Sequence, residues 1–276
     1  MKHLILDANN LIFRARHSCY RRNYENVIVH AFFRSLKPII EKFSPDYVYF
    51  VLDGKPQARL DMLPEYKANR TYHDKDNFGS QRKEIIKIIR GVFPFVTIRH
   101  PLAEADDVIA HLALASIPAD HEKIIVSSDT DFIQLCQDAP LTQLYNPISK
   151  SFRGAPSYPY AIWKALRGDS ADNIAGIRGI GNKRAAILAA DENAREQFFV
   201  QRSGAKKTFE RNVELITLSK LNDTSPLQIS WGNEDISQIF ETFTSLGFKS
   251  MITEKAWKKY STPFEDLSDG SQYIIS

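Results

Sequence analysis

Residues 47–53 have the sequence YVYFVLD, in which six apolar or aromatic residues lead directly into an aspartate. Two other runs share this form, LILD at residues 4–7 and IIVSSD at residues 124–129. A short, continuous apolar run is typical of a strand that is buried on both faces of a parallel sheet. Because ligands bind beyond the carboxyl ends of such strands, we expect the three aspartates to converge at one edge of the sheet.

Strand and helix patterns alternate around these three runs. The spacing of apolar residues predicts helices at 10–20, 27–43, 81–92, 103–113 and 132–136, and further strands at 95–99 and 141–145. This alternation predicts an α/β fold with a mostly parallel central sheet flanked by helices on both faces. We assign the α/β core to residues 1–155. The hydrophobic period breaks down at about residues 54–80, and a non-core insertion of this length is usually functional or disordered.

Beyond residue 155 the pattern becomes helical. Helices are expected at 158–166, 183–190, 195–200, 206–220 and 236–246, with a weaker stretch to residue 260. We therefore predict a C-terminal helical subdomain over residues 156–260. Residues 261–276 are polar and are expected to form a mobile tail.

The composition is that of a soluble globular protein, with 43% hydrophobic and 25% charged residues among 276. The two cysteines, Cys19 and Cys136, have neither paired nor metal-ligand spacing, which favours a reducing compartment. No run approaches the ~20 apolar residues of a membrane span, and no apolar export segment precedes the first strand. We expect a cytoplasmic protein that does not interact with membranes.

The net charge of +3 conceals a local imbalance. Residues 55–90 contain nine basic side chains and five acidic ones, a local charge of +4. A mixed charge run usually forms a solvated surface. Aromatic residues are interleaved with these charges, however, which favours a polyanion that carries stackable bases.

Acidic residues cluster in the segment Ala103-Glu104-Ala105-Asp106-Asp107. Acids in a first helical turn can have a purely structural role, because they complement the helix dipole. Because Glu104 and Asp107 are three residues apart, they should share one face and reach a common metal ion, whereas Asp106 should face a neighbouring site.

Two further acid pairs have the same character, Asp129 with Asp131 and Asp169 with Asp172. Asp131 can equally serve as the N-cap of the helix that follows it. Like charges this close could not all stay ionised without cations, and carboxylate oxygens suit Mg²⁺ or Mn²⁺ rather than zinc. The seven histidines show no ligand spacing, so we interpret them as structural or exposed.

A glycine-rich turn, Gly176-Ile177-Arg178-Gly179-Ile180-Gly181, leads into a helix that begins with Asn182-Lys183-Arg184. Glycines allow close backbone approach, and amide groups at a helix start can bind an anion with help from Lys183 and Arg184. Glycine turns between helices are common. Here, however, the turn directly follows Asp169 and Asp172, which links a phosphate-binding element to the acidic clusters.

Taken together, these motifs resemble the 5′ nuclease family, which includes flap endonucleases, the N-terminal nuclease domain of DNA polymerase I, and stand-alone bacteriophage 5′-3′ exonucleases. The resemblance covers roughly residues 3–220. It is carried by the following residues in the family's order: Asp7-x-x-Asn10, Asp53, Tyr66-Lys67-Ala68-Asn69-Arg70, Glu104-Ala105-Asp106-Asp107, Ser128-Asp129-Thr130-Asp131 and Gly168-Asp169-Ser170-Ala171-Asp172-Asn173, followed by Gly176 to Lys183.

The resemblance implies two adjacent metal sites that hold Mg²⁺, with Mn²⁺ as a substitute. The first would use Asp7, Asp53, Glu104 and Asp106, and the second Asp107, Asp129, Asp131, Asp169 and Asp172. It implies that residues 54–80 form a helical arch around a single-stranded 5′ end. It also implies that the glycine turn is a helix-hairpin-helix element that grips duplex DNA and holds K⁺.

Roles for basic and aromatic residues follow from the same resemblance. Lys67 and Arg70 would neutralise charge on the scissile phosphate, and Tyr66 would stack on a base. The implied DNA contacts are Arg59, Gly176, Gly179, Gly181, Lys183 and Arg184.

The implied activity is cleavage of 5′ flaps and of duplexes with 5′ ends, including RNA–DNA hybrids, by a monomer that works beside replication proteins. Two alternatives remain open: a PIN-type ribonuclease, which would not need the basic insertion or the glycine turn, and a non-catalytic binder of DNA junctions. The chain departs from the family pattern at Ala8, where many members have glycine, and its C-terminal residues show no sliding-clamp motif. The absence of a polymerase segment favours the bacteriophage type of enzyme.

Overall fold

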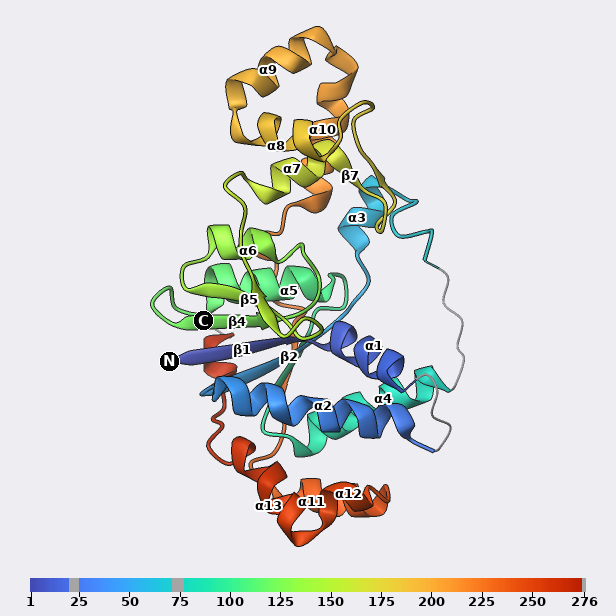
Figure 1. The fold of residues 1–276 in the computed structure, drawn as a ribbon, viewed down its shortest axis with the longest axis vertical. Coiled ribbons are helices and arrows are strands. Elements are labelled where there is room, and N and C mark those ends of the chain that lie inside the picture. The colour runs from blue at the N-terminus through green and yellow to red at the C-terminus, as the bar shows by residue number, and fades with distance from the viewer. Residues whose placement is uncertain (20–24, 71–76, 275–276) are drawn as a thin grey trace.

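The computed structural model describes residues 1–19, 25–70 and 77–274, and Figure 1 shows their arrangement. Within these residues the main sheet has the strand order β6-β5-β4-β1-β2-β3-β9. Its strands are β1 (Lys2–Asp7), β2 (Tyr47–Leu52), β3 (Val96–Arg99), β4 (Glu122–Val126), β5 (Thr142–Asn146), β6 (Ser151–Arg153) and β9 (Gln228–Trp231). The five central strands pair in parallel, whereas β6 and β9 are antiparallel edges. The predicted mostly parallel sheet is confirmed.

Helices cover both faces of this sheet. One face packs against α1 (Ala8–Ser18), α2 (Val27–Phe43) and α4 (Phe78–Val92). The other packs against α5 (Ala105–His111), its π-helical continuation (Leu112–Ser116) and α6 (Ile133–Asp138). Leu4 and Leu6 of β1 belong to the first core and Ile5 to the second, which explains why the strand sequence is apolar without interruption.

A helical subdomain lies at one end of the molecule (Figure 1). It contains α7 (Tyr160–Arg167), α8 (Asn182–Ala190), α9 (Glu192–Gln201) and α10 (Ser203–Ile216), together with the small hairpin of β7 (Gly168–Asp169) and β8 (Ile174–Ala175). Its core also includes Leu63 and Tyr66, which follow α3 (Gln57–Met62). The first part of the 54–80 insertion therefore packs on this subdomain. Residues 71–76, the centre of the expected arch, lie outside the described residues.

The C-terminal boundary of this subdomain differs from the prediction. Residues from β9 onward return to the α/β core and form α11 (Ser237–Ser245), α12 (Lys249–Ile252) and α13 (Glu254–Ser261). Phe243 and Tyr260 are buried in the same core as α2 and α4. Removal of their large aromatic surface from water stabilises the packing of this segment against the α/β core. The helical subdomain therefore ends before β9, not at residue 260.

The expected mobile tail is instead packed. Phe264 and Leu267 are buried in the core, and Ile274 is buried on the opposite face of the sheet. The amide of Ser268 donates to the carbonyl of Asp46 over 3.0 Å. Burial of these three apolar side chains offsets the entropy cost of ordering the segment.

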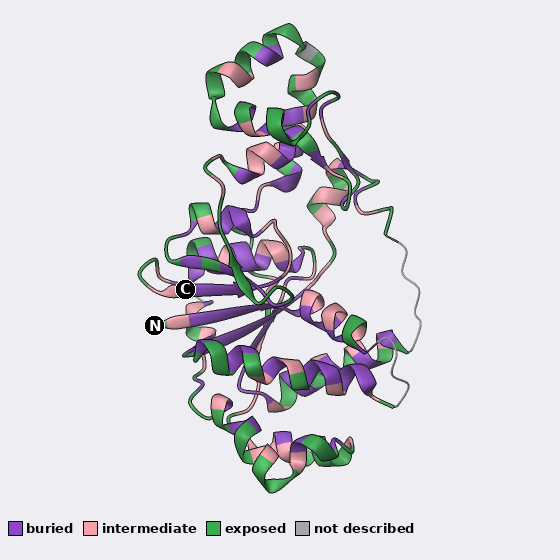
Figure 2. Ribbon diagram, viewed as in Figure 1, coloured by how far each residue is buried: buried purple, intermediate pink, exposed green. Residues whose placement is uncertain are grey.

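Figure 2 shows the sheet as the most continuously buried layer, with mixed burial in the helices at both ends of the molecule. No helix in the described part of the chain is long and apolar enough to cross a membrane.

Candidate active site

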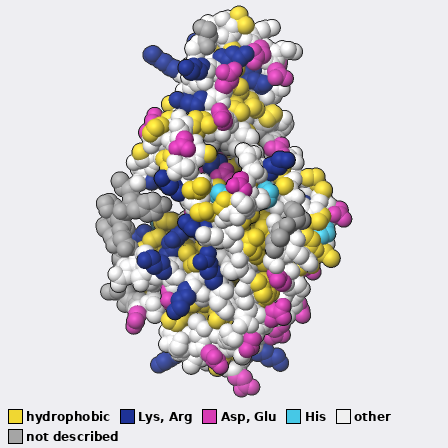
Figure 3. All heavy atoms as spheres, turned by 180° about the vertical axis from the view of Figure 1, so that it is seen from behind, with side chains coloured by type: hydrophobic (Ala, Val, Ile, Leu, Met, Phe, Trp, Pro, Cys, Tyr) yellow, Lys and Arg dark blue, Asp and Glu magenta, His cyan; other side chains and the backbone are white. Residues whose placement is uncertain are grey.

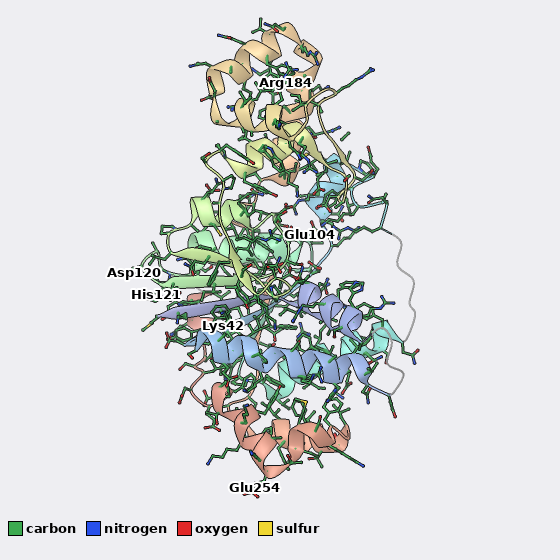
Figure 4. The ribbon with its side chains drawn as sticks, viewed as in Figure 1. Lys42, Glu104, Asp120, His121, Arg184 and Glu254 are labelled. Carbon is green, nitrogen blue, oxygen red and sulfur yellow. The ribbon has the colours of Figure 1, made fainter. Side chains whose placement is uncertain are left out.

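Five carboxylates line one pocket at the carboxyl ends of the central strands. The pocket has a volume of about 400 Å³, and Lys67 and Arg70 also line it. We call it the acidic pocket, and its carboxylates are Asp7, Asp53, Glu104, Asp106 and Asp129. Figure 4 places Glu104 at this edge of the sheet. The three strand-end aspartates thus converge, as their sequence positions predicted.

Asp7 is held by the turn between β1 and α1. It is the N-cap of α1 and accepts a hydrogen bond from the amide of Asn10 over 3.1 Å. The hydroxyl of Ser127, at the end of β4, donates to its other oxygen over 2.8 Å. Burial, with a smaller contribution from the charges of Asp53 and Asp129, outweighs these hydrogen bonds and raises the pKa of Asp7 to about 7.

Asp53 connects β2 to the start of α5. Its carboxylate accepts from the amide of Ala105 over 2.8 Å and from the side chain of Asn9. The guanidinium of Arg99 donates to its backbone carbonyl over 3.0 Å. These contacts fix the carboxylate at the edge of the acidic pocket.

The prediction that Glu104 and Asp107 face a common metal ion, with Asp106 directed elsewhere, is wrong. Glu104 is the N-cap, with φ −78° and ψ 164°, so helical spacing does not govern its direction. Asp106 lines the acidic pocket together with Glu104, whereas Asp107 does not line it. Burial raises the pKa of Asp106 well above its ordinary value, and the nearby charges of Asp129 and Asp7 add to this effect.

Asp107 is bound by Arg59 instead. The two guanidinium nitrogens of Arg59 donate to the two oxygens of Asp107, each over 2.7 Å, and one of them also reaches Glu104 over 3.1 Å. Asp107 also accepts from the amide of Glu104, which completes a capping box. Arg59 is largely buried and donates to the carbonyl of Leu215, so its contacts join the insertion to α5 and α10. In this arrangement it is not available to contact DNA.

Lys67 and Tyr66 link the acidic pocket to the helical subdomain. The Lys67 ammonium pairs with Glu104 and lies 3.6 Å from a carboxylate oxygen of Asp172. Although burial opposes it, these carboxylates raise the pKa of Lys67. The Tyr66 hydroxyl donates to Glu104 over 2.9 Å and lies 3.1 Å from Asp172.

The burial of Tyr66 in this structure does not favour the predicted stacking on a base. Tyr66 as a whole is only 6% exposed, and it packs in the core of the helical subdomain. A tyrosine in a charged segment looks exposed in the sequence, but here its hydroxyl finds acidic partners that allow burial. Arg70 is the more accessible neighbour, and it pairs with Asp172 over 2.5 Å.

A second acidic cluster lies beside the acidic pocket. Oxygens of Asp131, Asp169 and Asp172 lie within 4.8 Å of one another, a spacing that can hold a metal ion. Lys164 of α7 pairs with Asp131 and lies 2.7 Å from Asp169. Burial raises the pKa of Asp131 to about 6 despite this lysine, whereas Lys164 and local hydrogen bonds outweigh burial and lower the pKa of Asp169.

The glycine turn has two different parts. A Cβ atom at Gly176 would lie 1.9 Å from the carbonyl of Arg167, so the close packing of the turn against α7 requires glycine at this position. Gly179 has φ +82° and Gly181 is the N-cap of α8 without a side-chain cap. Lys183 and Arg184 are exposed at this helix start, and the Arg184 guanidinium lies 5.0 Å from the Phe198 ring centre.

Sequence reasoning missed three residues of these sites. Arg14 and Asn9 on α1 line the acidic pocket, and one Arg14 nitrogen is buried without a partner among the described residues. The available signal was the polar run that follows Asp7, in which Arg14 lies one helical turn after Asn10 and Asn9 lies beside it. Lys164 was also missed. Its signal was a lysine on the buried face of α7, four residues after Tyr160.

The donors fit divalent metal ions. Every candidate ligand is a carboxylate, the set preferred by Mg²⁺ and Mn²⁺. In the described residues no hydrogen bond or ion pair satisfies the carboxylate of Asp106, as expected of a carboxylate that serves as a metal ligand. Fold and site together define an α/β protein with two neighbouring acidic clusters at the carboxyl ends of its parallel strands, whose carboxylates fit divalent metal ions.

Comparisons with known proteins agree with this class. Residues 2–156 match the model of the 5'-3' exonuclease N-terminal resolvase-like domain, and the chain belongs to this family. It is 32% identical over 207 residues to DNA polymerase I of Mycobacterium tuberculosis, a match that covers 68% of this chain and 23% of the polymerase. It is 33% identical over 202 residues to DNA polymerase I of Treponema pallidum, covering 67% and 20%. The chain thus spans only about a fifth to a quarter of these relatives.

Solved structures show the same fold over nearly the whole chain. A bacteriophage T5 flap endonuclease in complex with DNA and metal ions has a TM-score of 0.64 and 19% identity, covering 96% of this chain and 99% of that one. The catalytic core of Rad2 in complex with DNA has a TM-score of 0.57 and 17% identity, covering 97% and 92%.

Proposed function

We propose that this chain is a structure-specific 5′ nuclease that hydrolyses DNA phosphodiesters at 5′ flaps, junctions and 5′ ends. The observation that carries the proposal is the acidic pocket, in which five carboxylates face Lys67 and Arg70 in a member of the 5′-3′ exonuclease family. An acidic pocket alone would repel DNA. The two basic side chains at its edge supply the attraction for a phosphate.

The acidic pocket would hold Mg²⁺, and the cluster of Asp131, Asp169 and Asp172 would hold a second ion, with Mn²⁺ as a substitute. When bound, such ions activate water and stabilise a leaving oxygen. Lys67 and Arg70 would hold the scissile phosphate and neutralise its developing charge. Hydrolysis would join the water oxygen to phosphorus and release the 3′ hydroxyl, leaving a 5′ phosphate.

Lys164 affects how strongly the second acidic cluster would bind a metal ion. Lys164 already neutralises part of the charge of Asp131 and Asp169, so a cation there would compete with its ammonium. In the acidic pocket Lys67 pairs with Glu104 and acts on Asp106 only at longer range, whereas Lys164 pairs directly with two of the three acids of the second cluster. The second site should therefore bind metal more weakly than the acidic pocket. We extend the proposal to a monomer that acts in the cytoplasm on DNA or RNA–DNA hybrids, beside replication proteins, and that holds K⁺ at the glycine turn.

Product mapping on an end-labelled 5′-flap duplex, with Mg²⁺ or EDTA, tests the proposal. We expect cleavage near the junction only with Mg²⁺, with 5′-phosphorylated products. Binding without cleavage in Mg²⁺ would support a non-catalytic junction binder. Cleavage of single-stranded RNA in preference to the flap would support a PIN-type ribonuclease.

Mg²⁺ should stabilise the protein more at about pH 8 than at about pH 6. The folded-state pKa of Asp7, about 7, lies above its ordinary value of 3.8. Protonated Asp7 therefore stabilises the metal-free protein fully at low pH. This stabilisation is lost as the pH rises through 7. Protons also compete with metal for the same oxygens at low pH. At saturating Mg²⁺ we expect the melting temperature to rise by about 5–10 °C at pH 8 and by less than about half of that at pH 6.

Calorimetry or circular dichroism with and without Mg²⁺ measures this difference. Na⁺ at matched ionic strength controls for general screening. An equal shift at both pH values would contradict the assignment of Asp7 as a buried metal ligand.

Lys183→Ala should weaken duplex binding without altering sequence preference. Lys183 is exposed at the start of α8, beside backbone amides that no side chain caps, an arrangement that suits a regular phosphate path. Loss of one phosphate contact should flatten the salt dependence of duplex affinity by about one unit, while affinity for free single strands changes little.

Fluorescence anisotropy over a salt series measures this slope. Lys258→Ala is the matched control, because Lys258 is exposed on α13 at the opposite end of the molecule (Figure 1). Wild-type duplex affinity and salt slope in Lys183→Ala would remove this lysine from the DNA path.

A further inference from the structure

A pocket lined by basic residues lies on the helical subdomain, and part of the glycine turn contributes to its lining. It has a volume of about 710 Å³, and three arginines from different segments line it: Arg178, Arg202 and Arg211. We call it the arginine pocket. Its remaining lining is uncharged: Ala175, Gly176, Ile177, Gln201, Gly204, Ala205 and Thr208. Figure 3 shows Lys and Arg side chains on this subdomain and along the face of the core seen from behind.

The three guanidinium groups have no acidic partner in the arginine pocket. Arg202 donates to the carbonyl of Arg178 over 3.3 Å, and Arg211 donates to the side-chain oxygen of Asn212 over 3.0 Å. The Nε atom of Arg211 is buried and has no hydrogen-bond partner among the described residues. Because arginine stays protonated at any relevant pH, a pocket lined by three arginines and no acid favours an anionic ligand.

The backbone adds a further preference for an anion. Arg202 is the N-cap of α10, a helix of 14 residues, and no side chain caps its first amides. The helix start therefore presents positive partial charge beside the guanidinium groups. Gly204 in the first turn leaves open space where a Cβ atom would stand, so a ligand can approach the backbone closely.

The floor of the pocket is rigid. Asn212, which is fully buried, donates to the carbonyls of Ala165 on α7 and Ala175 on β8 over 3.0 and 2.8 Å. These bonds fix α10 against α7 and against β8, the strand that leads into the glycine turn. The backbone of Arg211, the preceding residue, is thus positioned before any ligand arrives, which lowers the entropy cost of binding.

The position of the arginine pocket identifies its ligand. A Cβ atom built on Gly179 would lie 3.8 Å from a guanidinium nitrogen of Arg202, so the pocket adjoins the turn proposed to contact duplex DNA. Planar guanidinium forks match the oxygens of a phosphodiester. We propose that the arginine pocket binds a backbone phosphate of the substrate duplex, which extends the contact beyond Lys183 and Arg184. The choice of DNA as the ligand rests on the proposed nuclease function.

The double variant Arg178→Gln/Arg211→Gln tests this proposal. In EDTA, where no cleavage occurs, we expect its affinity for duplex DNA to fall about 5- to 20-fold and its salt slope to flatten by about one unit. The single-turnover rate at saturating enzyme with Mg²⁺ should stay within about twofold of wild type, because none of the three arginines lines the acidic pocket. The double variant Lys258→Gln/Lys259→Gln removes two exposed charges on α13 and serves as the matched control.

Further variants distinguish the loss of charge from the loss of guanidinium geometry and from disturbed packing. Arg178 is exposed, so Arg178→Gln alone should retain the wild-type melting temperature even if the change at Arg211 disturbs packing. Arg178→Lys/Arg211→Lys keeps the charge but removes the forked geometry, and its affinity should fall between wild type and the glutamine variant. Titration with inorganic phosphate and with a nucleoside monophosphate tests whether small anions occupy the pocket instead.

The possible outcomes separate this proposal from the proposed function. Unchanged duplex affinity and salt slope in the glutamine variant would overturn it, even if the enzyme cleaves flaps normally. If the glutamine variant binds free phosphate more weakly than wild type but binds duplex DNA equally well, the proposal is also overturned. The arginine pocket would then bind a small anion instead of DNA. If the wild-type protein binds duplex but cleaves nothing in Mg²⁺, the proposed function fails, whereas a flattened salt slope in the variant would still support the arginine pocket.

Discussion

Asp129→Asn should reduce flap cleavage by about 10³-fold or more while leaving junction binding intact, a loss of about 4 kcal/mol in transition-state stabilisation. Asp129 lines the acidic pocket with four other carboxylates, and its charge raises the pKa of both Asp7 and Asp106. A neutral amide of the same shape is a poor ligand for a divalent cation. Removing one negative charge cannot repel DNA, so affinity should stay constant or increase slightly.

The substitution should preserve the local fold. One oxygen of Asp129 accepts the amide of Asp131 over 2.9 Å, a bond that an asparagine oxygen can also accept. The amide of residue 129 would still donate to the hydroxyl of Ser127. With less repulsion in the acidic pocket, the metal-free variant should melt at the wild-type temperature or above it.

Single-turnover cleavage in Mg²⁺ and anisotropy in EDTA measure the two effects separately. Asp120→Asn is the matched control, because Asp120 is exposed at the opposite end of the sheet from Glu104 (Figure 4). Near-normal turnover in Asp129→Asn would exclude Asp129 from the metal site. Loss of both cleavage and binding would indicate a structural role instead.

The convergence of Asp7, Asp53 and Asp129 was predictable because it depends on local pattern and one general rule. Each aspartate ends an apolar run, and parallel strands place their carboxyl ends at one edge. Asp106 and Asp107 could not be assigned in the same way. Their directions depend on the exact residue at which α5 begins, and helix boundaries are the least certain part of a sequence-based prediction.

The C-terminal segment could not be placed from sequence because its contacts are distant along the chain. β9 pairs with β3, more than 125 residues earlier, and α11 packs against a core formed mostly by the first 95 residues. Local periodicity identified α11 as a helix but carried no information on its partner. Tyr66 and Arg59 illustrate the same limit, since their burial depends on acids that the fold brings from α5 and the helical subdomain.

Lys67→Ala should lower the single-turnover rate of cleavage by about 10²-fold while changing duplex affinity by less than about threefold. The Lys67 ammonium lies between Glu104 of the acidic pocket and Asp172 of the second cluster, which places it at the junction of the two candidate metal sites. There it can act on charge that develops on the scissile phosphate. The duplex is expected to bind elsewhere, at the glycine turn.

Backbone conformation makes alanine a clean probe at this position. Lys67 has φ 57°, in the left-handed region, and its amide donates to the carbonyl of Asp172 over 3.0 Å. Alanine also has a Cβ atom, so the conformational cost at this position stays similar, and the substitution removes the ammonium together with the methylene groups that carry it. Lys55→Ala, at an exposed lysine at the start of the same insertion, provides the control.

A Mg²⁺ titration separates two routes by which Lys67 can act. If the ammonium acts directly on the phosphate, the rate of Lys67→Ala stays low at saturating Mg²⁺. If it acts by orienting Glu104 as a metal ligand, the variant needs more Mg²⁺ but then recovers its rate, because the defect lies in metal affinity. A rate and a Mg²⁺ dependence that both match wild type would show that the ammonium contributes only to the packing of the insertion against the helical subdomain.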